Sequence, residues 1–210
     1  SDGNVQTVTL QKPMKKGVAF GVKHIDDDRF IITLTTNETT KEITDNQQFY
    51  LLVDKDGHAN RIPLAFPKNS QFVSKVLNKE LLNKGMNILT LFNSDGKPIT
   101  ERLIFNYADL FDAKLEVSKL ALETDSLKIQ VKLLDIDVVQ QNLSVSVLPG
   151  NTISHNQKNS IYSTFYLKPY IKGFIENPKY YFEDITTKKQ NELDLLLMTQ
   201  GWSRYDWNHI

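Results

Sequence analysis

The sequence predicts an all-β protein with two immunoglobulin-like antiparallel β-sandwich domains, followed by a short helical C-terminal segment. Three observations support this fold class. Short runs with apolar side chains at alternate positions recur between residues 18 and 105, polar turn residues separate these runs, and one pair of runs flanks an Asp-Gly dipeptide. About six or seven short strands with turn signals roughly every 8–12 residues are typical of immunoglobulin-like sandwiches.

Five predicted strands come first, each with apolar side chains on one face. They cover residues 18–22, 30–34, 49–53, 62–66 and 72–77. Polar connections such as Asp26–Asp28 and Asp54–Gly57 separate them. A helical turn over Asn78–Lys84 follows and is stopped by Gly85. With the hairpin that comes next, these elements form a first predicted domain, residues 4–107.

The clearest element is a hairpin over residues 86–105, with Asp95 and Gly96 as its turn. An Asp-Gly pair accepts the positive φ angles of a type I′ turn, which joins antiparallel strands. Counting outward gives three apolar cross-strand pairs on one face: Phe92 with Ile99, Ile88 with Leu103, and Met86 with Phe105. Only Thr90 opposite Glu101 interrupts this face. The turn and the apolar pattern agree on this register, because a slip of one residue would move Ile88 and Phe92 to the opposite face. We therefore predict an antiparallel sheet with this one face buried.

A second β-sandwich-like domain is predicted over residues 112–183, and it has few clear strands. Three half-buried strands are expected, at residues 115–117, 127–133 and 143–147. Pro149-Gly150 ends this series. Whether the domain is complete or borrows strands from chain outside this sequence stays open. A short helix is then expected from Ile161 to Lys168, ended by Pro169.

Residues 184–210 are predicted to form a helix and an aromatic tail. Thr187 and Gln190 have capping-box spacing, so the helix is expected to begin with Thr187 as its N-cap. One apolar stripe and its neighbours make the helix apolar over a wide arc: Leu193, Leu196 and Leu197, with Leu195, Met198 and Trp202 beside them. This breadth predicts burial on more than one side. Gly201 is expected to end the helix.

The composition excludes several classes of protein. Lys and Arg number 25 and Asp and Glu also number 25, so no overall field would attract nucleic acid or an anionic membrane. No apolar run approaches the roughly 18 residues that a membrane-spanning helix needs. Without any cysteine there is no disulfide, no thiolate nucleophile and no cysteine-ligated metal. The first residues lack both parts of an export signal, so we expect none within this sequence.

We predict no catalytic, cofactor or metal site, and therefore no enzyme. The four histidines fall at no metal-ligand spacing: His24, His58, His155 and His209. Asp54–Gly57 has its glycine at the fourth position, whereas a calcium loop needs it at the sixth, so a turn is expected. Asp26–Asp28 is interpreted as a strand connection. Nucleophile-elbow and nucleotide-binding motifs are absent from the sequence.

One constellation could bind a ligand, a group of aromatic residues toward the C-terminal end. Its members are Tyr162, Tyr166, Tyr170, Phe174, Tyr180, Tyr181, Phe182, Trp202, Tyr205 and Trp207. Aromatic faces stack on sugars or peptides, and the candidate interface residues are Tyr180, Tyr181, Trp202, Arg204, Tyr205 and Trp207. Packing of the C-terminal helix onto the second sheet explains the same residues more simply. Arg204 could form a cation–π contact in either case.

Three stretches resemble a known family. GMNILTLFNSDGKPITERLIFNY, residues 85–107, resembles the closing hairpin of macroglobulin-like β-sandwich domains. KGFIENPKYYF, residues 172–182, and LDLLLMTQGWSRYDW, residues 193–207, resemble paired motifs of large exported proteins from Bacteroidetes-type bacteria. In those proteins, macroglobulin-like domains precede a carboxypeptidase-regulatory-like domain and a TonB-receptor plug domain. Ser203 departs from the pattern, because the family often has a basic residue there.

The resemblance implies a non-enzymatic structural or interaction module of a periplasmic, outer-membrane-associated or cell-surface protein linked to TonB-dependent transport. The implied partners are other domains of the same longer chain, with an outer-membrane receptor or another envelope protein as a further candidate. Protease-trapping macroglobulins carry a Cys–Gln thioester, which a chain without cysteine cannot form. The alternative function is glycan or peptide binding by the C-terminal aromatic group.

Overall fold

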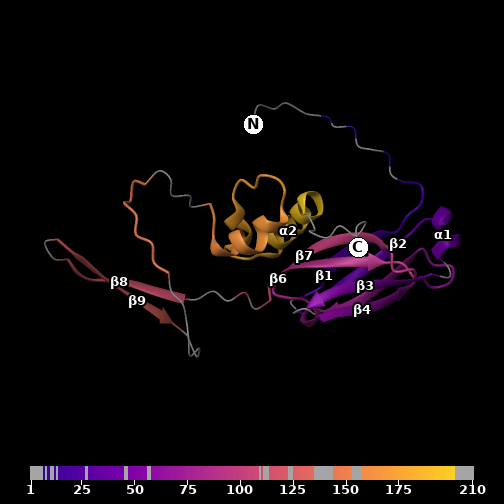
Figure 1. Cartoon of the computed structure of the whole chain (residues 1–210), viewed down its shortest axis with the longest axis horizontal. Helices are drawn as coiled ribbons and strands as arrows, with labels where there is room; N and C mark the ends of the chain where they lie inside the picture. Colours follow the sequence, from indigo (N-terminus) through magenta and orange to yellow (C-terminus); the bar gives the residue numbers. More distant parts are fainter. Residues whose placement is uncertain are drawn as a thin grey trace. The chain divides into compact units, whose positions relative to one another are not determined.

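The structure of the chain is a computed structural model. It describes residues 7, 9, 12, 14–26, 28–44, 47–55, 58–108, 110, 114–122, 125–134, 144–152 and 158–201. The chain forms two compact units (Figure 1). The first unit combines residues 1–108 with residues 158–210, and the second consists of residues 109–157.

Two antiparallel sheets make up most of the first unit. One sheet has the order β1-β2-β5 and consists of β1 (Ala19–His24), β2 (Arg29–Thr35) and β5 (Phe72–Asn78). The other has the order β4-β3-β6-β7 and consists of β3 (Gln48–Lys55), β4 (His58–Ala65), β6 (Gly85–Phe92) and β7 (Pro98–Asn106). All the strands expected before residue 107 are present. Two helical pieces connect strands: α1 (Glu38–Thr44), which the sequence analysis missed, and η1 (Lys79–Leu81).

The two sheets share one hydrophobic core. Alternate residues of β2 and β5 supply one side of it, and alternate residues of β3, β4, β6 and β7 supply the other. Its buried members include Phe30, Ile32, Leu34, Leu77, Phe49, Leu51, Val53, Ile62, Leu64, Leu89, Leu91 and Ile104. The prediction of a mainly β chain with antiparallel sheets is therefore confirmed, and the first unit is compatible with a β-sandwich.

The hairpin register is confirmed over most of its length and wrong beside the turn. Met86 lies opposite Phe105, Ile88 opposite Leu103 and Thr90 opposite Glu101, as predicted. Phe92 instead lies opposite Pro98, after a register shift between Leu91 and Phe92. The cause is Asn93, whose Oδ1 accepts hydrogen bonds from the backbone N–H groups of Asp95 (3.1 Å) and Lys97 (2.8 Å). These bonds make the connection longer than a two-residue turn.

Both faces of β6 are buried, which corrects the prediction of one buried face. Leu89 and Leu91 point into the shared core and are fully buried. Met86, on the face that the sequence predicted, is buried outside that core. On the same face, Leu103 and Phe105 of β7 are also buried outside the core. The cover on this side comes from the C-terminal segment, residues 158–201.

The C-terminal segment is helical and belongs to the first unit. It contains η2 (Ser163–Leu167), η3 (Lys168–Tyr170), η4 (Pro178–Phe182) and α2 (Thr187–Gln200). A helix is present where one was expected from Ile161 to Lys168: η2 is a π-helix that ends at Leu167, next to the predicted end before Pro169. A separate 3-10 turn, η3, follows it and has Pro169 in its first turn. Figure 1 shows this segment in orange and yellow, with α2 near β7.

The ends and faces of α2 differ in part from the prediction. Thr186, not Thr187, is the N-cap, and its hydroxyl accepts a hydrogen bond from the backbone N–H of Lys189. Gly201 ends the helix as expected, donating its N–H to the carbonyl of Leu197 at 2.9 Å. Burial is confined to one side, which includes Leu193 and Leu197. The prediction of burial on several sides was wrong, since Leu195 and Met198 are 56% and 53% exposed.

The boundaries of the units differ from the predicted domains, residues 112–183 and 184–210. Residues 158–183 lie in the first unit, together with α2. We expected α2 on the second sheet, but α2 contacts β7, and η2 contacts β6. The physical reason lies in the contacts at the C-terminal end of β7, where the ring of Phe105 meets that of Phe182 and Arg102 pairs with Asp194.

The second unit contains a two-stranded antiparallel ribbon, β8 (Lys114–Leu122) and β9 (Leu127–Leu134). Two of the three predicted strands are thereby confirmed. The third, residues 143–147, is not a strand over its described part, where Val145 and Val147 are 67% and 82% exposed. Leu143 lies outside the described residues.

Candidate functional site

The C-terminal segment meets the end of β7 in a group of five aromatic rings, which we call the aromatic cluster. Its members are Phe105, Tyr107, Tyr162, Tyr166 and Phe182. Phe105 is its centre, with ring centroids 4.6 Å from Tyr107, 6.3 Å from Tyr166 and 5.4 Å from Phe182, all edge to face. Each such pair contributes about 0.5–1.5 kcal/mol beyond burial. The cluster therefore attaches residues 162–182 to the first unit.

Gly85 allows the closest approach in this contact. Its φ angle is +80°, in the left-handed region that favours glycine. A Cβ atom at this position would lie 2.7 Å from Cε1 of Tyr166 and closer still to Cδ1. Glycine is therefore needed here for two independent reasons, the backbone conformation and the ring that lies against it.

A partly buried ion pair joins α2 to β7. Nη2 of Arg102 donates to Oδ2 of Asp194 at 2.7 Å, and the two side chains are only 10% and 24% exposed. Two tyrosines add hydrogen bonds: Tyr107 donates to the carbonyl of Tyr181 at 3.4 Å, and Tyr180 donates to Glu192 at 2.7 Å. Burial raises the pKa of Tyr107, so its hydroxyl stays a donor at neutral pH.

His24 ends β1 and lies close to this ion pair. Its Nδ1 atom is buried and has no hydrogen-bond partner among the described residues, and the same holds for Nε of Arg102. Burial lowers the pKa of His24, with a further lowering by the charges of Lys79 and Arg102 and an opposing contribution from Asp194.

The structure describes only two of the six predicted interface residues. Tyr180 and Tyr181 lie within η4 with ring centroids 5.3 Å apart and planes at 78°, so they do not form a flat platform with each other. The ammonium group of Lys189 lies 4.7 Å from the centre of the Tyr180 ring. The other four, Trp202, Arg204, Tyr205 and Trp207, lie outside the described residues. A binding platform that includes them stays a prediction.

Sequence reasoning missed the residues that organise this contact. Phe105 was expected on a buried face of the hairpin with no partner assigned to it, and Arg102, Asp194 and His24 were given no joint role. The available signal was the aromatic content of both partners, since Phe105 and Tyr107 end the hairpin and Tyr180 and its neighbours follow later. Nothing in the sequence showed that these two stretches meet.

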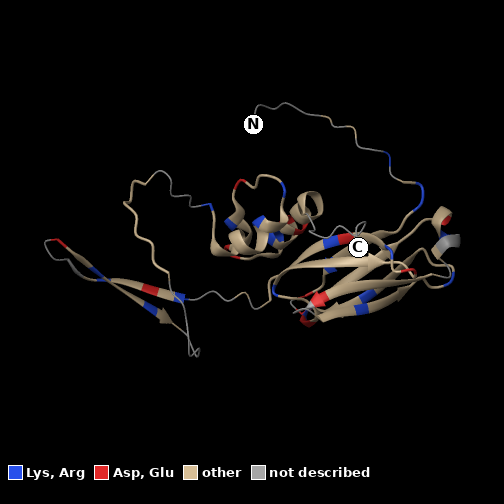
Figure 2. Ribbon diagram, in the orientation of Figure 1, with Lys and Arg blue, Asp and Glu red and all other residues tan. Residues whose placement is uncertain are grey.

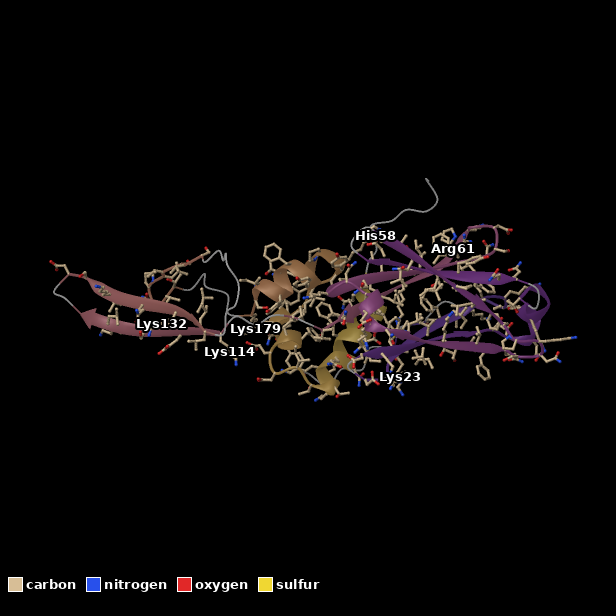
Figure 3. All side chains as sticks on the ribbon, turned by 90° about the horizontal axis from the view of Figure 1, so that it is seen from below. Lys23, His58, Arg61, Lys114, Lys132 and Lys179 are labelled. Atoms are coloured by element: carbon tan, nitrogen blue, oxygen red, sulfur yellow. The ribbon has the colours of Figure 1, made fainter. Side chains whose placement is uncertain are left out.

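The polar sites considered in the sequence behave as ordinary connections where the structure describes them. Asp26 binds Arg29 with its side chain at 2.6 Å and accepts the backbone N–H groups of Asp28 and Arg29. His58 is exposed at the start of β4 (Figure 3). Within the described ranges, no group of three His, Cys, Asp or Glu residues could hold a metal ion. His155, His209 and the Asp56-Gly57 pair fall outside those ranges.

One open depression lies elsewhere on the first unit, with a volume of about 610 Å³. It is lined by Val76, Leu77, Asn78, Glu80 and Leu81. The carboxylate of Glu80 is the one titratable group among these lining residues. A single carboxylate on an open surface provides no pair of acid and base groups for catalysis.

Comparison with known proteins leaves the family open. No model of a known protein family matches this sequence. No curated protein matches it either. Within the described residues, none of the helices has the length and apolar character needed to span a membrane.

Proposed function

We propose that this chain is a non-enzymatic structural and interaction module, in which the first unit is a rigid base and the β8–β9 ribbon contacts a neighbouring β-domain. The observation that carries this proposal is the ribbon's uncovered apolar face. Val117 is 65% exposed, and Leu115 and Ile129 are each nearly half exposed. The partner is a β-domain of the same longer protein that offers a matching apolar sheet face.

The ribbon has one apolar face and one polar face, as does a sheet that packs against a partner on one side only. On one face Leu115 pairs with Leu133 and Val117 pairs with Val131. On the other face the cross-strand pairs are polar: Glu116 with Lys132 and Ser118 with Gln130. Figure 3 shows Lys132 on this ribbon. A two-stranded ribbon alone is marginally stable in water, so its apolar face favours contact with a further sheet.

The gain from covering this face is large enough to matter. Full burial of a Val, Leu or Ile side chain contributes about 1.5–3 kcal/mol. Three side chains that are about half exposed would therefore contribute roughly 2–4 kcal/mol when covered. This amount favours a contact between domains that are already tethered in one chain, because tethering raises their effective concentration.

The first unit is suited to act as a base because residues on both sides of the second unit belong to it. The chain leaves the first unit at Ala108 and re-enters it at Lys158, so the second unit is an insertion held at both ends. The aromatic cluster and the Arg102–Asp194 ion pair fasten the returning segment to β7. Because the second unit is joined to the first unit at both of its ends, its ribbon has less conformational freedom than a ribbon on a free chain end. It therefore loses less conformational entropy when it binds a partner.

The charge distribution supports a protein partner over a polyanion. Lys and Arg equal Asp and Glu in number, at 25 each. Figure 2 shows basic and acidic residues interspersed along the coloured parts of both units. Binding to nucleic acid relies on a basic surface that neutralises phosphates.

The cellular setting is proposed from the resemblance of three stretches to macroglobulin-like modules of large exported proteins. Two antiparallel sheets around one core support a macroglobulin-like or immunoglobulin-like assignment of the first unit. We place the protein in the periplasm, the outer membrane or the cell surface, in association with TonB-dependent transport. Glycan or peptide binding by the C-terminal aromatic group remains the alternative, and no described contact favours it.

Site-specific photo-crosslinking in the full-length protein tests the proposed contact. A photoreactive amino acid replaces Val117 on the apolar face, and the matched control replaces Ser118, its neighbour on the polar face. The proposal predicts crosslinks from position 117, mapped by mass spectrometry to strand peptides of a neighbouring β-domain, and few from position 118. Equal crosslinking from both positions, or none from position 117, would contradict it.

A further inference from the structure

The two strands of the ribbon are basic, although the chain as a whole is neutral. β8 and β9 together carry four lysines and one glutamate. Two of these lysines, Lys128 and Lys132, lie four positions apart on β9, on the polar face of the ribbon, and both are exposed. Glu116 lies opposite Lys132, but in the described part of the chain no ion pair joins either lysine to a carboxylate. A positive charge without a counter-ion therefore follows β9.

β9 also has an open and unbroken edge. Its sheet contains two strands, so the backbone groups on the outer side of β9 have no strand partner among the described residues. β9 runs over eight residues without a proline. β8 is less regular, because its register with β9 shifts between Lys119 and Ala121. A bulge bends a strand and interrupts its ladder, so β9 is the better edge of the ribbon for a further strand.

The strand edges of the first unit are protected in ways that β9 is not. β1 contacts β7 and β5 contacts β4, so the edges of the two sheets lie against each other. β4 contains Pro63, which has no N–H group to offer a further strand. The ammonium group of Lys75 on β5 lies 3.5 Å from the carbonyl oxygen of Pro63. Helix α2 contacts β7. The described edges of the sandwich are therefore poor sites for strand addition.

The lysines of β9 act on the choice of partner in two ways. Like charges opposite each other in a ladder are destabilising, so Lys128 and Lys132 oppose pairing of β9 with a second copy of itself. Opposite charges at the same positions are stabilising, so the two lysines favour a strand that carries carboxylates there. Protection against aggregation alone would not account for Val117, which is 65% exposed on the apolar face of the same ribbon. The lysines therefore fit a surface that excludes one partner and accepts another.

We propose that β9 accepts a third strand from the neighbouring β-domain, and that this strand carries acidic residues opposite Lys128 and Lys132. This inference rests on the proposed contact of the ribbon and names the chemistry of its partner. Residues opposite each other in a ladder lie on the same face of the sheet. The added strand therefore has apolar residues opposite Ile129 and Val131 and a polar residue opposite Gln130. Its pattern is acidic, apolar, polar, apolar, acidic.

A third strand would stabilise the ribbon as well as bind it. Two strands alone are marginally stable in water, whereas three strands with an apolar face reach independent stability. In strand addition the main-chain hydrogen bonds supply affinity, and the alternate side chains supply specificity. The apolar residues of the added strand extend the face that contains Val117 and Val131, which gives the neighbouring sheet a larger surface to cover. Edge and face contacts with one partner therefore support each other.

Titration of the whole chain with two capped synthetic peptides tests strand addition. One peptide is TEVTVET, which has the proposed pattern, and the other is TKVTVKT, which has lysine in place of each glutamate. Nuclear magnetic resonance follows the backbone amides of the chain, both their chemical shifts and their hydrogen exchange. We expect the glutamate peptide to bind about tenfold more tightly than the lysine peptide. The amides that gain protection should be those of β9.

Charge reversal on β9 provides the matched comparison. K128E/K132E should reverse the preference, so that the lysine peptide binds more tightly than the glutamate peptide. K128E alone should remove most of the preference. K119E is the control, because it changes the charge of the ribbon by the same amount on β8, at a position opposite Ile129 on the apolar face. It should leave the preference largely intact. Should K128E/K132E lose the ribbon, K128Q/K132Q should bring the two peptides to equal affinity.

Several results would overturn the acidic strand. They are equal binding of the two peptides to the wild type, equal effects of K128E and K119E, and protection of β8 in place of β9. Absence of binding at several millimolar peptide would also overturn it, because domains joined by short flexible linkers reach effective concentrations in the millimolar range. Photo-crosslinking from position 117 measures a separate contact. Crosslinks from that position without any preference for the glutamate peptide would leave the proposed contact of the apolar face intact and remove the acidic strand alone.

Discussion

Replacement of Gly85 by alanine is the sharpest perturbation of the docked C-terminal segment. A β-carbon at this position lies 2.7 Å from Cε1 of Tyr166, well inside contact distance. It also forces a non-glycine residue to adopt a φ angle of +80°. The backbone conformation costs about 1–2 kcal/mol, and overpacking against a ring adds about 1–3 kcal/mol. We expect G85A to lower the free energy of unfolding by about 2–5 kcal/mol.

Gly96 provides a matched control for this substitution. Its φ angle is +76°, almost the same as that of Gly85, and a β-carbon there would meet nothing within 4 Å. G96A should therefore show the backbone cost alone, about 1–2 kcal/mol. The difference between the two variants isolates the contact with Tyr166.

Urea unfolding followed by circular dichroism measures both variants, with hydrogen exchange of β6 to report on the first unit specifically. The reasoning is refuted if G85A and G96A lose the same stability. Equal losses would mean that Tyr166 does not lie against Gly85 in solution.

Three further predictions concern the Arg102–Asp194 ion pair, the buried side of α2 and His24. R102M and D194N should each lower the free energy of unfolding by about 1–3 kcal/mol, because each removes a charge-assisted hydrogen bond and leaves a partly buried charge unpaired. In a double-mutant cycle the double variant should lose less than the sum of the two single losses, and additive losses would contradict the pairing. L197A should lower the free energy of unfolding in urea by about 2–5 kcal/mol, because it leaves a cavity at a buried position. L195A, at an exposed position of the same helix, should lower it by less than about 0.5 kcal/mol. Equal losses in the two variants would contradict burial of α2 on one side. In H24Q, the loss of unfolding stability between about pH 7 and pH 5 should be smaller than in the wild type, because His24 no longer takes up a proton on unfolding; an identical pH profile would contradict this.

Local signals in the sequence were sufficient for most strands. The alternation of apolar residues in β2 and the Asp95-Gly96 turn depend on neighbours within a few positions. The pairs Met86–Phe105 and Ile88–Leu103 therefore came out correctly. The predicted partner of Phe92 was wrong, because the side chain of Asn93 forms hydrogen bonds that lengthen the turn. The alternation of apolar residues does not reveal such hydrogen bonds.

Helix α1 was missed although a local signal existed. Oδ1 of Asn37 accepts the backbone N–H of Thr40 at 3.0 Å, which is an N-cap contact. The helix is short, and its run of threonines has low helix propensity. Its formation therefore depends on the cap and on packing more than on composition.

The docking of the C-terminal segment could not be predicted from local patterns. Arg102 and Asp194 are 92 positions apart, and an inserted unit separates Phe105 from Phe182. The apolar stripe of α2 showed that the helix needs a partner but not which sheet supplies it. The hairpin face that contains Met86 was recognised as apolar and buried, but the sequence did not show which part of the chain covers it.

The central claim is that residues 158–201 pack on β7 of the first unit. Nuclear Overhauser contacts between selectively labelled phenylalanine and tyrosine rings in the whole chain test it most directly. The account predicts cross-peaks between the rings of Phe105 and Phe182, whose centroids are 5.4 Å apart, and between Tyr166 and the α-protons of Gly85. Cross-peaks from Phe182 to side chains of β8 or β9, with none to Phe105, would contradict it.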